Sequence, residues 1–176
     1  MLREEDHAED ISSPVASWTG IRLFLALTTL YNLTPLQLDI NLAYLNAPLE
    51  EDIYMHPPRG STTPHGVFWK LEKSLYGLKQ SGKNWHKMFT NVLQGQGFDF
   101  TQLGTEECLF TRLDGDEITI LFIYVDDVYI ASSHTETLDA FHKELSKHFD
   151  LKILGIPRQL LGVLSSLSHS VPRTPL

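Results

Sequence analysis

Apolar residues recur at helical spacing in the first part of the chain, at Ile21, Phe24, Leu25 and Thr28. Residues three or four positions apart lie on one face of a helix. Upstream, Ser13-Pro14 offers a capping serine followed by a proline suited to the first helical position. We therefore predict a helix from about Pro14 to Tyr31.

Short runs that alternate apolar and polar residues predict strands. Leu36-Gln37-Leu38-Asp39-Ile40 follows Pro35 and ends near an aspartate. Residues 53–55 and 67–71 flank a loop rich in proline and glycine, which predicts a hairpin. Further on, we predict strands at Cys108 to Leu113, Ile118 to Val125, Val128 to Ala131 and Leu151 to Leu154. The first two of these are joined by Asp114-Gly115-Asp116, which favours a tight turn.

Two more amphipathic segments predict helices. One runs from Ser81 to Leu93 and is ended by Gly95 and Gly97. The other runs from Thr135 to Phe149. Strands that alternate irregularly with helices predict an α+β fold, with an antiparallel sheet and helices packed on one face. We divide the chain into an acidic N-terminus (1–12), one folded region (13–163) and an irregular tail (164–176).

Composition limits the classes of protein that the chain can be. With 176 residues, of which 42% are hydrophobic, it can bury the core of one domain. Its net charge of −8 argues against a protein that binds nucleic acid unaided, because phosphate contacts come from Lys and Arg. The acidic start lacks the features of a secretion signal, and the apolar run at 21–30 is too short to span a bilayer. We expect an intracellular protein of the cytoplasm or nucleus, neither secreted nor bound to a membrane.

The most informative feature is a pair of adjacent carboxylates, Asp126-Asp127, within an almost continuous apolar stretch from residue 120 to 130. Two like charges beside an apolar sheet are costly unless a cation offsets their repulsion and desolvation. Aspartate is also a favoured turn residue, so a simple exposed turn between two strands is the alternative interpretation. Both interpretations stay open from this stretch alone.

Asp39 favours the metal interpretation, because it also lies at the end of an apolar strand. If the two strands are neighbours, three carboxylates meet and can hold two Mg²⁺ ions. Such a pair of ions can activate an attacking hydroxyl and stabilise a leaving pyrophosphate. Mg²⁺ prefers oxygen ligands and retains waters and substrate phosphates, so carboxylates suffice on the protein side.

Several sequence blocks resemble the reverse transcriptase domain of copia-type (Ty1/copia, Pseudoviridae) retrotransposons. The blocks run in the family's order from about residue 14 to 163. They are Gln37-Leu38-Asp39-Ile40, Ala43-Tyr44-Leu45-Asn46, Leu49-Glu50-Glu51-Asp52-Ile53-Tyr54-Met55, Pro57-Pro58, Lys70-Leu71, Lys73-Ser74-Leu75-Tyr76-Gly77-Leu78-Lys79-Gln80-Ser81, Trp85 and Tyr124-Val125-Asp126-Asp127. The block around Tyr76 is far more specific than an Asp-Asp pair.

The resemblance implies a function and a metal site. It implies the palm region of an RNA-directed DNA polymerase that transfers nucleotides to a primer 3′-hydroxyl. Asp39, Asp126 and Asp127 match the catalytic, metal-binding carboxylates, and the Ile40 carbonyl is a further expected ligand. The implied cofactor is two Mg²⁺ ions, for which Mn²⁺ can substitute. The implied partners are an RNA or DNA template with its primer, deoxynucleoside triphosphates, and other parts of a retrotransposon polyprotein.

The resemblance also implies a nucleotide site formed by Ile40, Ala43, Tyr44, Tyr76, Gly77 and Lys79. Tyr44 matches the bulky ring that excludes a ribose 2′-hydroxyl, although a tyrosine of the core is the alternative interpretation. Gly77 allows the backbone to approach a base pair closely. Lys79 is either a contact to nucleotide or template or a solvated surface charge. Tyr124 matches a residue beside the primer end, and packing within the sheet is its alternative.

The chain departs from the family pattern at a few positions, which are Leu42, Ala47, Gly82 and Arg59-Gly60. Leu42 lies where a small polar residue is common. Ala47 lies where glycine is common, and Gly82 lies where proline is common. The basic fingers segment, the thumb and the RNase H domain of full-length relatives have no counterpart in the sequence. We therefore expect little or no polymerase activity from the isolated chain. A non-catalytic relic or domesticated palm, acting as an interaction or structural unit, is the alternative function, and a two-metal hydrolase is a third class.

Overall fold

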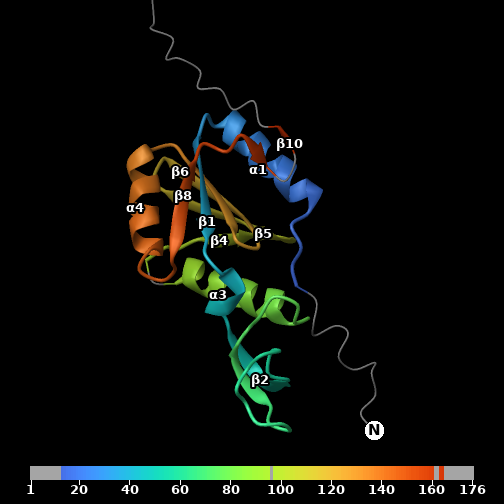
Figure 1. Cartoon of the computed structure of the whole chain (residues 1–176). Coiled ribbons are helices and arrows are strands. Elements are labelled where there is room, and N and C mark those ends of the chain that lie inside the picture. Colours follow the sequence, from blue (N-terminus) through green and yellow to red (C-terminus); the bar gives the residue numbers. More distant parts are fainter. Residues whose placement is uncertain (1–12, 96, 161–162, 165–176) are drawn as a thin grey trace, which may run out of the picture.

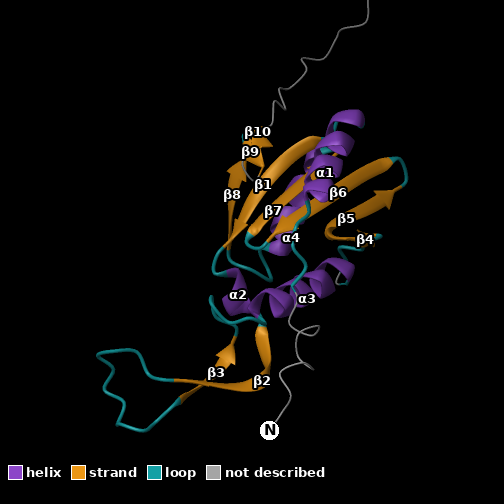
Figure 2. Ribbon diagram, turned by 90° about the vertical axis from the view of Figure 1, so that its right-hand side faces the viewer, coloured by secondary structure: helices purple, strands orange, loops and turns teal. Residues whose placement is uncertain are grey.

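The computed structural model describes residues 13–95, 97–160 and 163–164, and its centre is a sheet of six strands in the order β4-β5-β6-β7-β1-β8. All neighbouring strands in this sheet are antiparallel. Figures 1 and 2 show the sheet with its helices. The strands are β1 (Thr34–Ile40), β4 (Thr101–Leu103), β5 (Glu106–Asp114), β6 (Glu117–Tyr124), β7 (Asp127–Ser132) and β8 (Leu151–Gly155). The predicted antiparallel sheet is thus present, with β4 as a short strand that the apolar pattern did not reveal.

The helices lie on both faces of this sheet. They are α1 (Trp18–Leu30), α2 (Ala43–Asn46), α3 (Ser81–Gln94) and α4 (Thr135–Leu145). On β6, the ring of Phe122 lies 6.1 Å from that of Phe24 in α1. The preceding residue, Leu121, pairs with Phe110, whose ring lies 6.4 Å from that of His86 in α3. Because successive strand residues point to opposite faces, α1 and α3 cover different faces.

The α+β class is therefore correct, whereas the prediction of helices on one face is wrong. The reason is visible in β6, where Ile120, Leu121, Phe122 and Ile123 are all buried. An unbroken apolar run of this kind requires cover on both sides of the sheet.

Helix α1 begins four residues later than predicted. Its N-cap is Ser17, whose side-chain oxygen accepts a hydrogen bond from the backbone N–H of Gly20 at 2.8 Å. The same hydroxyl donates to Glu106 of β5 at 2.7 Å. Ser17 therefore satisfies a free N–H of the first turn and also ties the helix to the sheet. The predicted cap at Ser13-Pro14 is wrong.

An aromatic cluster joins α3 to the turn that follows α4. The ring of Trp85 lies 5.4 Å from that of Phe89 and 5.3 Å from that of Phe149. The prediction for α3 is confirmed to within one residue, with Gly95 as its C-cap. Helix α4 ends at Leu145, four residues before the predicted end, and residues 146–149 form a turn. Phe149 is buried all the same, because the turn directs its ring towards α3.

A second, two-stranded sheet stands apart from the first. It is the hairpin of β2 (Pro48–Met55) and β3 (Trp69–Lys73), and Figures 1 and 2 show it on the far side of α3 from the main sheet. The predicted hairpin is confirmed, although β3 starts at Trp69 rather than Val67. A short pair, β9 (Gln159–Leu160) with β10 (Val163–Leu164), closes the described chain. Most of the predicted tail lies outside the described residues. Within them, no helix is both long and apolar enough to cross a membrane.

The core under α1 provides a test of this arrangement. Phe24 is completely buried between Phe122 and Tyr129. We expect Phe24→Ala to lower the free energy of unfolding by about 3–5 kcal/mol, through lost burial and the cavity left behind. As a control, Leu113→Ala, at a side chain that is 73% exposed, should change it by less than about 0.5 kcal/mol. Urea unfolding followed by circular dichroism measures both, and equal losses would contradict the placement of α1.

Candidate functional site

The adjacent carboxylates lie in a tight turn between two buried strands. Tyr124 is the last residue of β6 and pairs with Asp127, the first residue of β7. Val125 and Asp126 are therefore the two central residues of the turn. Val125 has a φ of 53°, which is the left-handed region. The predicted strand through Val125 is thus one residue too long, because the chain reverses at that position.

Asp39 meets this turn through the pairing of β1 with β7. Asp39 lies directly opposite Asp127, and the backbone N–H of Ile40 donates to the Asp126 carbonyl at 2.8 Å. Directly opposed residues project their side chains on the same face, with Cβ atoms about 4.5–5.5 Å apart. The strand pairing therefore brings the backbones of the three aspartates that the sequence singled out next to one another.

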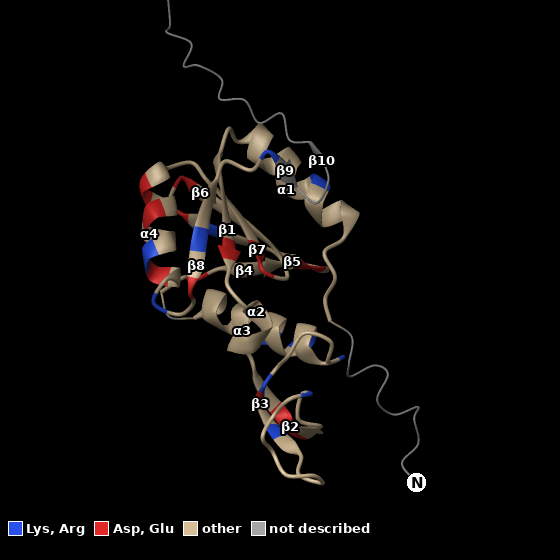
Figure 3. Cartoon of the chain, in the orientation of Figure 1, with Lys and Arg blue, Asp and Glu red and all other residues tan. Residues whose placement is uncertain are grey.

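Lys152 of β8 lies opposite Asp39 on the other side of β1. Figure 3 shows the acidic segments of β1 and of the turn into β7 close together, with a basic segment of β8 beside them. Lys152 could not be predicted as a neighbour of Asp39, because their pairing joins strands whose residues lie 113 positions apart in the chain.

The surroundings of Asp127 raise the pKa of its carboxyl group. Burial raises its pKa, and the negative charges of Asp126 and Asp39 raise it further. A hydrogen bond from the Gln37 side chain, 2.9 Å from Asp127 Oδ1, acts in the opposite direction. Gln37 was not predicted as a site residue, yet it lies two residues before Asp39 and so points to the same face of the strand. That alternation was the signal available in the sequence.

Two tyrosines lie beside the acids. Tyr44, in α2, and Tyr76, in the loop before α3, have ring centroids 4.5 Å apart. The pKa of each hydroxyl is raised, first by burial and next by the charge of Asp126. Ala43 is the buried first residue of α2, and hydrogen bonds from the backbone at Ala43 and Tyr44 oppose the shift at Tyr76. The structure thus places Ala43, Tyr44 and Tyr76 near the turn.

The remaining predicted residues lie on the surface. Gly77 has a φ of 100°, a conformation suited to glycine, and both it and Lys79 are exposed in the segment that leads into α3. Tyr124 is 38% exposed at the end of β6. These positions leave Tyr124 and Lys79 accessible to a ligand, and the solvated interpretation of Lys79 stays open.

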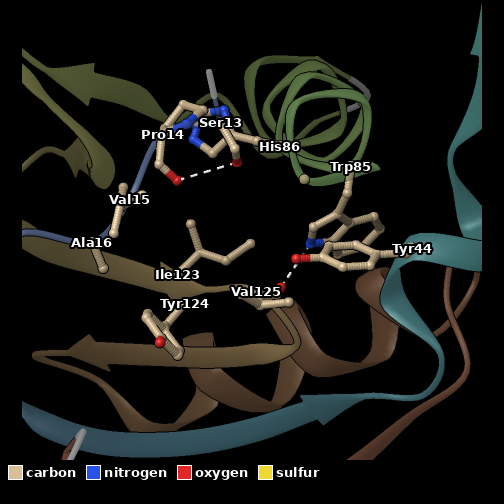
Figure 4. A pocket seen from close by; sticks show the side chains of 12 residues that line it. Ser13, Pro14, Val15, Ala16, Tyr44, Trp85, His86, Ile123, Tyr124 and Val125 are labelled. Carbon is tan, nitrogen blue, oxygen red and sulfur yellow. Dashed lines mark hydrogen bonds between the residues drawn. The ribbon is translucent and has the colours of Figure 1, made fainter. Parts of the chain in front are cut away.

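A cavity of about 210 Å³ lies beside the turn. Residues 13–16, α3 and the end of β6 line it, as Figure 4 shows. The indole N–H of Trp85 donates to the Val125 carbonyl at 2.6 Å across its edge. Burial raises the pKa of the Cys108 thiol, which also lines the cavity, to about 11. Cys108 is therefore protonated at neutral pH, as expected for a structural thiol.

Gly82 lies at another wall of the cavity. A methyl group placed on Gly82 would come within 2.7 Å of Ser13 Oγ and 2.9 Å of Ser13 Cβ. Ser13 and Gly82 therefore fit together only because residue 82 has no side chain.

In this conformation, the side chains of the three aspartates do not form a metal-binding cluster. Within residues 13–95, 97–160 and 163–164, no three His, Cys, Asp or Glu side chains lie close enough together to hold a metal ion. What the fold supplies is the backbone placement of Asp39, Asp126 and Asp127 and a set of hard oxygen donors, which suits Mg²⁺ or Mn²⁺.

The raised pKa of Asp127 predicts a pH-dependent stability. The folded state binds this proton more tightly than the unfolded state, whose pKa is near the ordinary 3.8. The group therefore contributes stability that is complete below pH 3.8 and is lost as the pH rises through the folded pKa. The amide oxygen of Asp127→Asn can still accept the hydrogen bond from Gln37. We therefore expect this variant to have a higher free energy of unfolding than the natural chain at pH 7, and the difference to disappear below pH 3.8.

Urea unfolding over a pH series measures this gain, with Asp139→Asn on the exposed surface of α4 as the matched control. A gain that stayed constant with pH would contradict the proposed environment of Asp127.

Comparison with known proteins places the chain in a family. A family model described as reverse transcriptase (RNA-dependent DNA polymerase) matches residues 2–168. The retrovirus-related Pol polyprotein from transposon TNT 1-94 of Nicotiana tabacum is 38% identical over 159 residues, which cover 88% of this chain and 12% of that protein.

Two further relatives agree. The retrovirus-related Pol polyprotein from transposon RE1 of Arabidopsis thaliana is 35% identical over 150 residues, covering 84% of this chain and 10% of that protein. The transposon Ty1-NL2 Gag-Pol polyprotein of Saccharomyces cerevisiae is 36% identical over 138 residues, which cover 76% of this chain and 7% of that protein. The chain thus spans between 7% and 12% of the length of these three relatives. It belongs to the reverse transcriptase family, and within it to the copia-type reverse transcriptases of retrotransposon Pol polyproteins.

Proposed function

We propose that the chain carries the catalytic palm of an RNA-directed DNA polymerase, with Asp39, Asp126 and Asp127 as its metal-binding carboxylates. The observation that carries the proposal is the cross-strand pair of Asp39 with Asp127, next to Asp126 in the turn. Family members of this kind act with divalent metal ions, and the three carboxylates provide the oxygen ligands that such ions prefer. Because the backbones are already adjacent, side-chain rotation alone would bring the carboxylates around a cation.

The proposed reaction is nucleotidyl transfer. The primer 3′-hydroxyl oxygen forms a bond to the α-phosphorus of a deoxynucleoside triphosphate while the bond from that phosphorus to the bridging oxygen breaks. Pyrophosphate leaves with the bonding electrons, and the hydroxyl proton passes to solvent. Divalent ions held by the carboxylates would lower the pKa of the hydroxyl and neutralise charge on the phosphates. The Ile40 carbonyl is proposed as a further ligand.

Residues around the turn would select and orient the substrates. Tyr44 lies four residues beyond Ile40, and the Asp126 charge acts on both its hydroxyl and that of Tyr76. A sugar bound above the acids would therefore meet the Tyr44 ring, which leaves little room for a 2′-hydroxyl. Ala43, Tyr76, Gly77 and Lys79 would complete the nucleotide site, and Tyr124 would support the primer end. A template and its primer are the proposed macromolecular ligands.

Metal binding tests the proposed site directly. We expect Mn²⁺, measured by its electron paramagnetic resonance signal, to bind the full chain and to bind Asp126→Asn at least roughly tenfold more weakly, because a lost contact to a charged group costs about 1.5–3 kcal/mol. Asp39→Asn should behave alike, whereas Asp139→Asn on α4 should bind as the natural chain does. Equal Mn²⁺ affinity in the natural chain and Asp126→Asn would refute the site.

Primer extension tests the reaction. With Mg²⁺, deoxynucleotides and an RNA template annealed to a DNA primer, any extension by the chain must disappear in Asp126→Asn. Tyr44→Val should raise the use of ribonucleotides relative to deoxynucleotides by about tenfold, with Tyr54→Val on the exposed hairpin as control. Mn²⁺ binding that accompanies phosphate ester hydrolysis but no extension would indicate a two-metal hydrolase instead.

A further inference from the structure

The turn that carries Asp126 has an unfavourable backbone conformation. Val125 has a φ of 53°, where its branched side chain crowds the backbone. Four non-glycine residues in the described ranges have a positive φ, and Val125 is the β-branched one among Asn32, Leu42, Asp99 and Val125. A glycine is the residue normally found at the first central position of such a two-residue turn. Contacts from outside the turn must therefore hold this conformation.

Trp85 provides such a contact. Its indole N–H donates to the Val125 carbonyl at 2.6 Å, and Figure 4 shows the indole pointing from α3 towards the turn. Trp85 is only 2% exposed and is fixed between the rings of Phe89 and Phe149. The donor is thus held by a rigid cluster and cannot easily turn away. The Val125 carbonyl is partly buried, so losing this donor would leave it with weaker compensation for its desolvation.

The hydrogen bond from Trp85 also restrains the backbone of Asp126. The Val125 carbonyl belongs to the planar peptide unit that also contains the Asp126 nitrogen and Cα. Fixing that oxygen therefore fixes the direction in which Asp126 leaves the turn. On the other side, the Asp126 carbonyl accepts from the Ile40 N–H at 2.8 Å. The turn is held between α3 and β1.

We propose that Trp85 is a positioning residue, whose indole N–H holds the strained turn so that Asp126 stays in register with Asp39 and Asp127. The role in metal binding rests on the proposed function, whereas the hold on the turn does not. A tryptophan that served only as core packing would stabilise the whole domain and would have no particular link to Val125.

Hydrogen exchange at the Ile40 amide, followed by NMR, tests the hold on the turn without any metal. Trp85→Phe keeps a buried ring but removes the donor. The Leu121 amide, in the central strand β6, reports global unfolding and serves as the reference. We expect Trp85→Phe to lower the protection of the Ile40 amide against exchange about threefold to tenfold more than that of the Leu121 amide. With Val125→Gly the strain is gone, so adding Trp85→Phe should lower Ile40 protection by less than about twofold.

Equal losses at Ile40 and Leu121, or equal losses with and without Val125→Gly, would overturn the proposal. Trp69→Phe is the matched control, because it removes an indole N–H that donates to Thr63 at 3.1 Å on the distant hairpin. It should leave Ile40 protection unchanged. If Trp85→Phe does not fold, Val125→Gly alone decides: it should raise the melting temperature, and a lower one would show that Val125 is unstrained.

Mn²⁺ titration of the same variants tests the consequence for the acids. We expect Trp85→Phe to weaken Mn²⁺ binding about threefold to tenfold, and Val125→Gly to remove most of that loss. An unchanged affinity in Trp85→Phe would overturn the positioning role. If the natural chain binds no Mn²⁺, the proposed function fails, while the exchange experiment still decides whether Trp85 holds the turn.

Discussion

The antiparallel pairing of β1 with β7 is the constraint on which the rest of the site depends. Side chains alternate between the two faces of a strand, so a slip of one residue would move Asp39 to the face opposite Asp127. Burial prevents that slip: Leu38 and Ile40 on β1 and Val128 and Ile130 on β7 are almost completely inaccessible to solvent. Their burial against α3 and α4 fixes the register, and the register places the acids. The hydrophobic core therefore determines where Asp39 and Asp127 lie relative to each other.

Much of this arrangement was predictable because it is local. Asp39 at the end of an alternating strand, the Asp114-Gly115-Asp116 turn and the amphipathic α3 all follow from spacing over a few residues. The three aspartates were predicted as a group on the assumption that two strands are neighbours, and the pairing of Thr34–Ile40 with Asp127–Ser132 confirms that assumption. Whether they bind metal stays a prediction.

What the sequence did not reveal depends on contacts between distant segments. Ser17 rather than Ser13 caps α1, because Ser17 also reaches Glu106, 89 residues further along the chain. Helices cover both faces, because β6 is apolar at consecutive positions, a pattern that does not indicate which helix covers which side. Only the fold brings Lys152 opposite Asp39 and the indole N–H of Trp85 to the Val125 carbonyl. Residues of this kind carry no periodic signal.

The contact between Ser13 and Gly82 limits which residues can occupy position 82 in this fold. A Cβ at residue 82 would lie 2.7 Å from Ser13 Oγ and 2.9 Å from Ser13 Cβ. The two positions are thus coupled sterically, although 69 residues separate them. Any residue larger than glycine at 82 would therefore require the Ser13 side chain to shift. The shape of the cavity beside the acidic turn is thus set by two residues from distant parts of the chain, and a change at either one alters the space that the other can occupy.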